Sequence, residues 1–337
     1  MLVVDIQLPV IELISGVLQM FNVQKIHYSD DGIKALNIFR ETSPDLLIVD
    51  WELFNSNGVD FTKLIRSSPE NPFVPIIFMT AFTSKQRVTR ARDSGITEFL
   101  AKPFTADSLY KRLENIVEKP RQFVFTPDYR GPDRRRKHDK SYQGIERRNR
   151  KELDLTTTET DVFKTQKKYR DAKSVTIMRQ KIAEFVTPPN IMRQKIGSGG
   201  IDTTAFAMAK NFLDNNTIDF MPIGLKLVNA LAEGLRDSKK EGVASKAAIE
   251  SILYPAAQLK GQGALFHFPL ITGIAGILVN FLETVEGIDE DVFKIVEAHI
   301  TAISFVLKNN ITGDGGAYGN ALRSSLIEAC GRYYKTR

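Results

Sequence analysis

The sequence predicts an α/β domain with a doubly wound, five-stranded parallel sheet, followed by a basic linker and an all-α helical bundle. Three observations support this fold class. Apolar runs alternate with amphipathic stretches in residues 1–119, positive charge is concentrated in 120–200, and apolar residues recur at three- and four-residue spacing in 201–337. With 337 residues and 42% hydrophobic content, the chain is long enough to bury two cores.

The predicted strands are short apolar runs, and a helical pattern follows each of them. The strands are expected at 2–4, 23–27, 46–49, 74–79 and 96–101. The helices are expected at 10–21, 33–39, from 59 onward, 84–93 and 106–117. Because strands and helices alternate throughout, the strands should be parallel, with helices on both faces of the sheet.

Polar side chains stand at the carboxyl ends of three of these strands. Asp50 ends the run LLIVD, Thr80 ends IIFMT, and Lys102 follows FLA. The carboxyl ends of parallel strands lie at one edge of the sheet, where ligands bind in open α/β folds. A carboxylate, a hydroxyl and an ammonium group are therefore expected to converge there, and together they suit a phosphoryl-accepting site.

Four motifs in this order resemble the receiver domain of two-component response regulators, a flavodoxin-like fold of the CheY type. They are LVVD at 2–5, PDLLIVDW at 44–51, MTA at 79–81 and AKPF at 101–104, and the turn at Gly58 also fits. An unrelated nucleotide-binding α/β domain is not indicated, because no glycine-rich phosphate loop follows the first strand.

The resemblance implies that Asp50 takes a phosphoryl group from a sensor histidine kinase, with Mg²⁺ as cofactor. It also implies that Thr80 hydrogen-bonds a phosphoryl oxygen and that Lys102 supplies a compact positive charge, followed by a cis peptide to Pro103. Phe99 falls at the position of the family's switching aromatic residue. Its alternative role is that of an ordinary core residue of the last strand.

One position departs from the family pattern. Receiver domains usually carry two adjacent acids after the first strand, whereas Asp5 is followed here by Ile6. The expected Mg²⁺ ligands are therefore Asp5, Asp50 and the backbone carbonyl of Glu52, completed by water. Two interpretations stay open: a phospho-acceptor with weakened metal affinity, and a phosphorylation-independent pseudo-receiver adaptor.

Composition predicts a cytoplasmic protein. The single cysteine, Cys330, excludes an internal disulfide and fits a reducing compartment, and no secretory signal pattern opens the chain. The longest apolar stretch, 266–282, is interrupted by polar residues and a proline, so we expect a buried helix there and no membrane span.

The excess positive charge belongs to the predicted linker. Residues 121–151 hold eleven Lys or Arg against four Asp or Glu, a local charge of +7, while the whole chain has +6. Proline, glycine and like charges favour a largely irregular tether; a contact strip for an acidic partner is the alternative. The same linker contains IMRQKI twice, at 177–182 and 191–196.

The C-terminal part is expected to be an all-α domain of about six helices, with its later helices at 243–259, 269–284, 289–309 and 317–334. It resembles no family that we recognise and lacks a catalytic motif, so we expect a non-enzymatic output module. The candidate partners are an unidentified output protein and a second copy of the chain.

Two further functions are weighed as alternatives. A DNA-binding transcriptional regulator would use the basic residues of 121–151 to contact DNA. No helix-turn-helix motif accompanies them, so nucleic acid is not the favoured partner. A phosphorelay enzyme would use His299, which lies on a predicted helix but lacks the Lys and Gly that usually follow the histidine of phosphotransfer domains.

Overall fold

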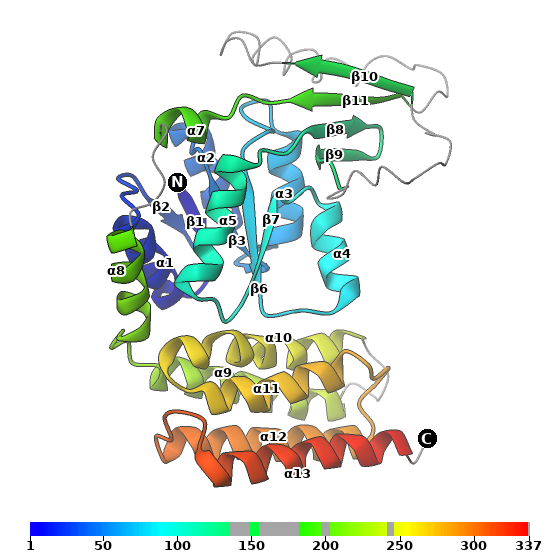
Figure 1. The fold of residues 1–337 in the computed structure, drawn as a ribbon. Coiled ribbons are helices and arrows are strands. Elements are labelled where there is room, and N and C mark those ends of the chain that lie inside the picture. Colours follow the sequence, from blue (N-terminus) through cyan, green and yellow to red (C-terminus); the bar gives the residue numbers. More distant parts are fainter. Residues whose placement is uncertain (135–148, 155–181, 197–202, 241–245, 336–337) are drawn as a thin grey trace, which may run out of the picture. The chain divides into compact units, whose positions relative to one another are not determined.

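The computed structural model describes residues 1–134, 149–154, 182–196, 203–240 and 246–335. These divide into two compact units, one containing most of residues 1–212 and the other most of 213–337. Figure 1 shows the helices and strands of both units.

The first unit contains the predicted five-stranded parallel sheet, with the strand order β2-β1-β3-β6-β7. Its strands are β1 (Leu2–Val4), β2 (His27–Ser29), β3 (Leu47–Asp50), β6 (Ile76–Thr80) and β7 (Glu98–Ala101). Strand β1 pairs in parallel with both β2 and β3, and β3 pairs in parallel with β6. The strand order therefore reverses at β1, which places the ligand-binding crevice at the carboxyl ends of β1 and β3.

Five helices follow these strands: α1 (Leu8–Met20), α2 (Gly32–Thr42), α3 (Gly58–Ser67), α4 (Lys85–Asp93) and α5 (Ala106–Glu118). Figure 1 shows α5 in front of the sheet and α3 behind it. Capping residues in the sequence determine where two of these helices begin. The Asp31 side chain accepts hydrogen bonds from the backbone N–H groups of Ile33 and Lys34, and Thr105 forms a capping box with Ser108.

The segment predicted as a largely irregular linker contains a second sheet, and this corrects the prediction. Its strands, in the order β10-β11-β8-β9, are β8 (Phe123–Thr126), β9 (Tyr129–Pro132), β10 (Asn149–Asp154) and β11 (Ile182–Thr187). Strand β8 pairs antiparallel with both β9 and β11. The apolar runs FVFT and IAEFVT form β8 and β11, whereas β10 has the charged sequence NRKELD. Part of the basic run, 135–148, lies outside the described residues.

Strand β8 is buried on both faces, which explains why it is ordered. Phe123 and Phe125 pack edge-on against Phe73, in the loop before β6, with ring centroids 5.3 and 5.7 Å apart, whereas Val124 packs with Phe185 on the opposite face. Gly95 has a φ of +101°, and a Cβ there would lie 2.8 Å from the Arg130 carbonyl oxygen. The second sheet thus packs against the amino-terminal side of β6 and β7.

Two short segments also pack onto this unit. Helix α7 (Ile191–Ile196) is the second IMRQKI copy, and Lys195 Nζ lies 2.8 Å from the Asp45 carboxylate. The first copy lies outside the described residues except for Ile182. Helix α8 (Thr203–Asp214), predicted as part of the helical domain, packs instead against α1 and α5: Phe206 contacts the Tyr110 ring at 5.8 Å, and Phe212 fills the space beside Gly16.

The second unit is helical, as predicted. It contains α9 (Met221–Lys240), α10 (Lys246–Gln262), the 3₁₀ turn η2 (Ala264–Phe266), α11 (Pro269–Leu282), α12 (Glu290–Lys308) and α13 (Gly316–Lys335). Helix α9 packs against α10 and α12, and α11 packs against α10, α12 and α13. Asp289 caps α12 through hydrogen bonds from Asp291 N and Val292 N. The described residues include no helix with the length and apolarity required to cross a membrane.

A hairpin and a glycine turn shape the chain at the carboxyl edge of the first sheet, beside Asp50. Strands β4 (Glu52–Leu53) and β5 (Ser56–Asn57) form a short hairpin directly after β3. The hairpin then turns into α3 at Gly58, whose N–H donates a 2.8 Å hydrogen bond to the Trp51 carbonyl. A Cβ at Gly58 would lie only 2.1 Å from the Asp50 carbonyl oxygen, so the close approach requires glycine.

Candidate functional site

Two acids lie side by side at the switch point of the sheet. Val4 of β1 is paired in register with Val49 of β3, so the residues that follow, Asp5 and Asp50, occupy equivalent positions on neighbouring strands. Both carboxylates are buried, with exposed fractions of 0% and 1%. Asp5 Oδ1 accepts a 2.9 Å hydrogen bond from Gln7 N, which fixes its orientation at the start of α1.

The other two predicted residues occupy the next strand ends. Asp50 is paired with Met79, so Thr80 stands one residue further along β6, and Lys102 N donates a 2.8 Å hydrogen bond to the Thr80 carbonyl. Thr80 and Lys102 are 1% and 3% exposed. The Thr80 Oγ1 accepts a 2.9 Å bond from Phe82 N, which leaves its hydroxyl proton able to bond a ligand oxygen. The peptide between Lys102 and Pro103 is cis, as the resemblance implied.

The donor set at this edge suits a hard divalent cation that keeps several water ligands. Mg²⁺ prefers oxygen and is commonly held by one or two carboxylates together with substrate phosphates and water. Asp5, Asp50 and the Glu52 carbonyl satisfy that pattern, whereas Ile6 adds no oxygen. Within the described residues, no group of three or more His, Cys, Asp or Glu side chains is placed to hold a metal ion.

Phe99 lies on β7 and is half-buried, not enclosed in the core. It therefore has one face in contact with the domain and another that can be reached from outside. Its role as a switching residue stays a prediction.

Sequence reasoning missed one contact that holds the loop after β3. The Asn55 Nδ2 donates a 2.7 Å hydrogen bond to Asp31 Oδ2, and Asn55 has a φ of +58°. Because Asp31 also caps α2, the bond ties the hairpin that carries Glu52 to the first turn of that helix. The NSNG turn and an aspartate before an apolar helix were the available signals.

Comparisons with known proteins agree with this architecture. The family model described as the response regulator receiver domain matches residues 1–114. The chemotaxis protein CheY-3 of Vibrio cholerae is 27% identical over 107 residues, covering 32% of this chain and 82% of that protein. Residues 1–114 are therefore a response regulator receiver domain of the CheY-like kind. The chain is a receiver-domain protein of two-component signalling, and the family match ends before the helical unit.

Solved structures are also similar over the same part of the chain. A putative response regulator from Chloroflexus aurantiacus has 29% identity and a TM-score of 0.34, covering 35% of this chain and 96% of that chain. The receiver domain of a sensor histidine kinase from Pseudomonas aeruginosa, whose structure holds a magnesium ion in its active-site cleft, has 25% identity and a TM-score of 0.32, covering 34% and 93%.

His299, the candidate for a phosphorelay, is placed in the core of the helical unit. Its side chain is 0% exposed, its Nδ1 lies 2.7 Å from the Ile295 carbonyl, and its Nε2 is buried without a hydrogen-bond partner in the described structure. A phosphotransfer histidine has to meet a partner's aspartate at the surface. The burial of His299 therefore gives no support to the phosphorelay alternative.

Burial lowers the pKa of His299 below its ordinary value of 6.5, despite the opposing hydrogen bond to Ile295. As the pH falls through 6.5, His299 binds a proton in the unfolded chain but stays neutral in the folded chain. The folding stability that is present above pH 6.5 is therefore lost below it. We expect His299→Leu to reduce this loss by at most about 1.4 kcal/mol per pH unit. Denaturation followed by circular dichroism between pH 7.5 and 5 tests this; an unchanged slope, or the same change in a His27→Leu control, would contradict it.

Proposed function

We propose that Asp50 is a phospho-acceptor that takes its phosphoryl group from a sensor histidine kinase. The observation that carries this proposal is the arrangement of Asp50, Thr80 and Lys102 at the carboxyl ends of the neighbouring strands β3, β6 and β7. A carboxylate can act as the nucleophile, while a hydroxyl and an ammonium group on the adjacent strand ends can bind the oxygens of a phosphoryl group.

The proposed reaction uses the residues of this chain as nucleophile and as charge stabilisers. An Asp50 carboxylate oxygen attacks the phosphorus of a phosphohistidine, and the P–N bond breaks as the P–O bond forms. The Thr80 hydroxyl donates a hydrogen bond to one phosphoryl oxygen, while the Lys102 ammonium group offsets the negative charge on another. Asp5, Asp50 and the Glu52 carbonyl would hold a Mg²⁺ ion, which would supply further charge neutralisation.

A phosphorylation-independent adaptor is the second candidate, and the hydrophobic side chain of Ile6 favours it. A site with two carboxylates and no third acid binds Mg²⁺ less tightly, because affinity depends on the number of charged oxygen ligands. If the metal is bound too weakly at cellular concentrations, the domain signals through its fold and partners alone.

Output is proposed to run through protein–protein contacts of the helical unit, either with another protein or with a second copy. Helices α12 and α13 support this, because they leave large apolar side chains exposed: Phe305 at 43%, Tyr318 at 53%, Ile327 at 55% and Tyr334 at 51%. Apolar surface of this kind is a common feature of association sites.

The test is labelling of the full chain with a small phosphodonor, with and without Mg²⁺. The parent protein should gain one acid-stable, base-labile phosphoryl group in a Mg²⁺-dependent manner, seen by intact mass, and Asp50→Asn should lose all of it. Asp107→Asn, which changes a 55% exposed carboxylate on α5, is the matched control and should label like the parent. Light scattering of the same samples shows whether labelling changes self-association.

Two outcomes would overturn the proposal. Failure of the parent to label at any Mg²⁺ concentration would favour the phosphorylation-independent adaptor. Labelling that survives in Asp50→Asn would place the phosphoryl group elsewhere.

A further inference from the structure

A basic cavity of about 340 Å³ lies in the first unit, on a side of β7 away from Asp50. It is bounded by α4, β7, α5 and the segments that enter and leave the β8–β9 hairpin. Four of its lining residues are arginines: Arg92 on α4, Arg112 on α5, Arg121 before β8, and Arg134 after β9. The volume falls within the range of small-molecule sites in proteins.

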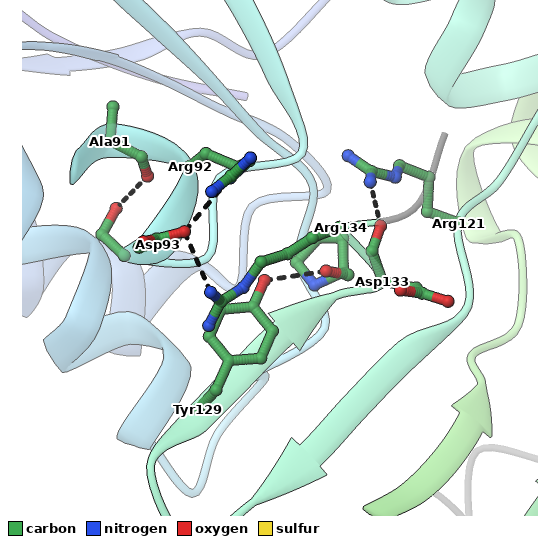
Figure 2. Close-up of polar contacts among 9 residues, drawn as sticks. Ala91, Arg92, Asp93, Arg121, Tyr129, Asp133 and Arg134 are labelled. Carbon is green, nitrogen blue, oxygen red and sulfur yellow. Dashed lines mark hydrogen bonds and ion pairs between the residues drawn. The ribbon is translucent and has the colours of Figure 1, made fainter. Parts of the chain in front are cut away.

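The arginines are held in place by the surrounding structure. Arg134 stacks on the Tyr129 ring, with its guanidinium carbon 3.8 Å from the ring centroid, and its NH1 lies 3.0 Å from Asp93 Oδ1. Arg92 Nε reaches the same Asp93 oxygen at 3.1 Å. Arg121 donates to the carbonyl oxygen of Thr97. It also donates to the carbonyl oxygen of Asp133, and Figure 2 shows this bond with those of Asp93. Ordered guanidinium groups lose little entropy when they bind a ligand.

The charge balance of the cavity is positive. Among the described residues, the ion-pair partners of these arginines include Asp93, which is shared by Arg92 and Arg134, and Glu98, whose carboxylate lies 3.3 Å from Arg112. Among the described residues that line the cavity, four are arginines and none is an acid. In addition, Arg112 Nε is buried and has no hydrogen-bond partner among the described residues. A buried donor of this kind is costly, and an anionic ligand oxygen would satisfy it.

The shape of the wall restricts the ligand further. Val88 and Phe99 add apolar surface beside the arginines. Guanidinium groups match phosphate oxygens in bidentate geometry, and a phosphate offers more acceptor oxygens than a single carboxylate. We propose that this arginine-lined cavity binds a small phosphate-bearing molecule whose non-polar part rests on Phe99 and Val88.

Phenyl phosphate is a suitable probe because it combines a phosphate with a planar apolar ring. Its binding to the full chain is followed by ligand-observed NMR in Mg²⁺-free buffer, with inorganic phosphate as the comparison. We expect phenyl phosphate to bind several-fold more tightly than inorganic phosphate. We expect Arg112→Gln to raise the dissociation constant by roughly tenfold and Arg92→Gln by roughly three- to tenfold.

Arg90→Gln is the matched control, because Arg90 is an exposed arginine on the same helix as Arg92 and does not line the cavity. Arg112→Gln removes the ion-pair partner of the buried Glu98, so its folding has to be checked by Trp51 fluorescence. Arg92 is half-exposed, and its replacement should leave the fold intact. The proposal is overturned if phenyl phosphate does not bind at millimolar concentration, or if Arg92→Gln binds it as tightly as the Arg90→Gln control does.

Discussion

Replacing Arg66 by methionine is expected to destabilise the receiver domain by about 3–5 kcal/mol, because three backbone carbonyls lose their donor. Arg66 is 2% exposed at the end of α3. Its Nε donates to the Gly95 carbonyl at 2.7 Å, and its NH1 donates to the carbonyls of Pro72 and Val74 at 2.8 and 2.7 Å. Burial lowers its pKa to about 9, so it is still protonated at pH 7.

The expected loss is large because the one buried guanidinium group of Arg66 joins the backbone at Pro72, Val74 and Gly95. Gly95 lies before β7 and Val74 lies before β6, and the guanidinium carbon is 5.1 Å from the ring centroid of Phe123 on β8. Methionine can fill the volume but donates nothing. The amino-terminal ends of both strands and the attachment of the second sheet should weaken together.

Urea denaturation monitored by Trp51 fluorescence measures this effect. Trp51 is the single tryptophan of the chain and is buried against Phe78 in the receiver core, so its signal reports this domain. Lys63→Met, on the exposed side of α3, is the matched control and should change stability by less than about 0.5 kcal/mol. Equal stability of Arg66→Met and the parent would show that the three carbonyls do not depend on Arg66.

The second large expected effect is an increase in the affinity of the receiver domain for Mg²⁺. We expect Ile6→Asp to tighten Mg²⁺ binding by on the order of tenfold, because it adds a carboxylate next to Asp5 and Asp50 and affinity rises with the number of charged oxygen ligands. Ile6 follows Asp5 directly at the carboxyl end of β1, so the new side chain can reach the same edge of the sheet. Phosphodonor labelling of Asp50 should then need less Mg²⁺.

Mg²⁺ titration followed by Trp51 fluorescence, with labelling as a second readout, tests this expectation. Gln24→Asp is the control, because it adds the same charge in the exposed loop before β2, at the opposite end of the sheet. If Ile6→Asp binds Mg²⁺ no more tightly than the parent, then the missing acid is not what limits the metal site. A similar gain in Gln24→Asp would mean that overall charge, not a new ligand, causes the effect.

The receiver fold could be predicted from sequence because each of its strands and helices has a recognisable pattern within a short stretch of the chain. The runs LLIVD and IIFMT are long enough and apolar enough to be recognised as buried strands, and the polar residue at each end marks the carboxyl edge. Parallel strands joined by helices leave few topologies, so the neighbourhood of Asp50, Thr80 and Lys102 followed from the pattern. Their chemical roles stay predictions.

The segment after α5 was mispredicted for the opposite reason. Charge, proline and glycine dominate its composition, but β8 pairs with β11 about sixty residues further along the chain, and Phe123 and Phe125 are buried by Phe73 of the receiver. Neither partner is visible in a local window. Likewise, α8 has an ordinary amphipathic pattern, and only its contacts with Tyr110 and Gly16 show which unit it covers.

Several features could be read from the amino-acid sequence alone: the alternation of strands and helices, the polar residues at the strand ends, the missing acid at Ile6 and the helical character of the second unit. These depend on residue type and on periods of two to four residues. Other features became visible only in the folded chain: the second sheet after α5, the burial of His299, and the cavity lined by Arg92, Arg112, Arg121 and Arg134. These depend on contacts between residues far apart in the chain, which the local pattern does not encode.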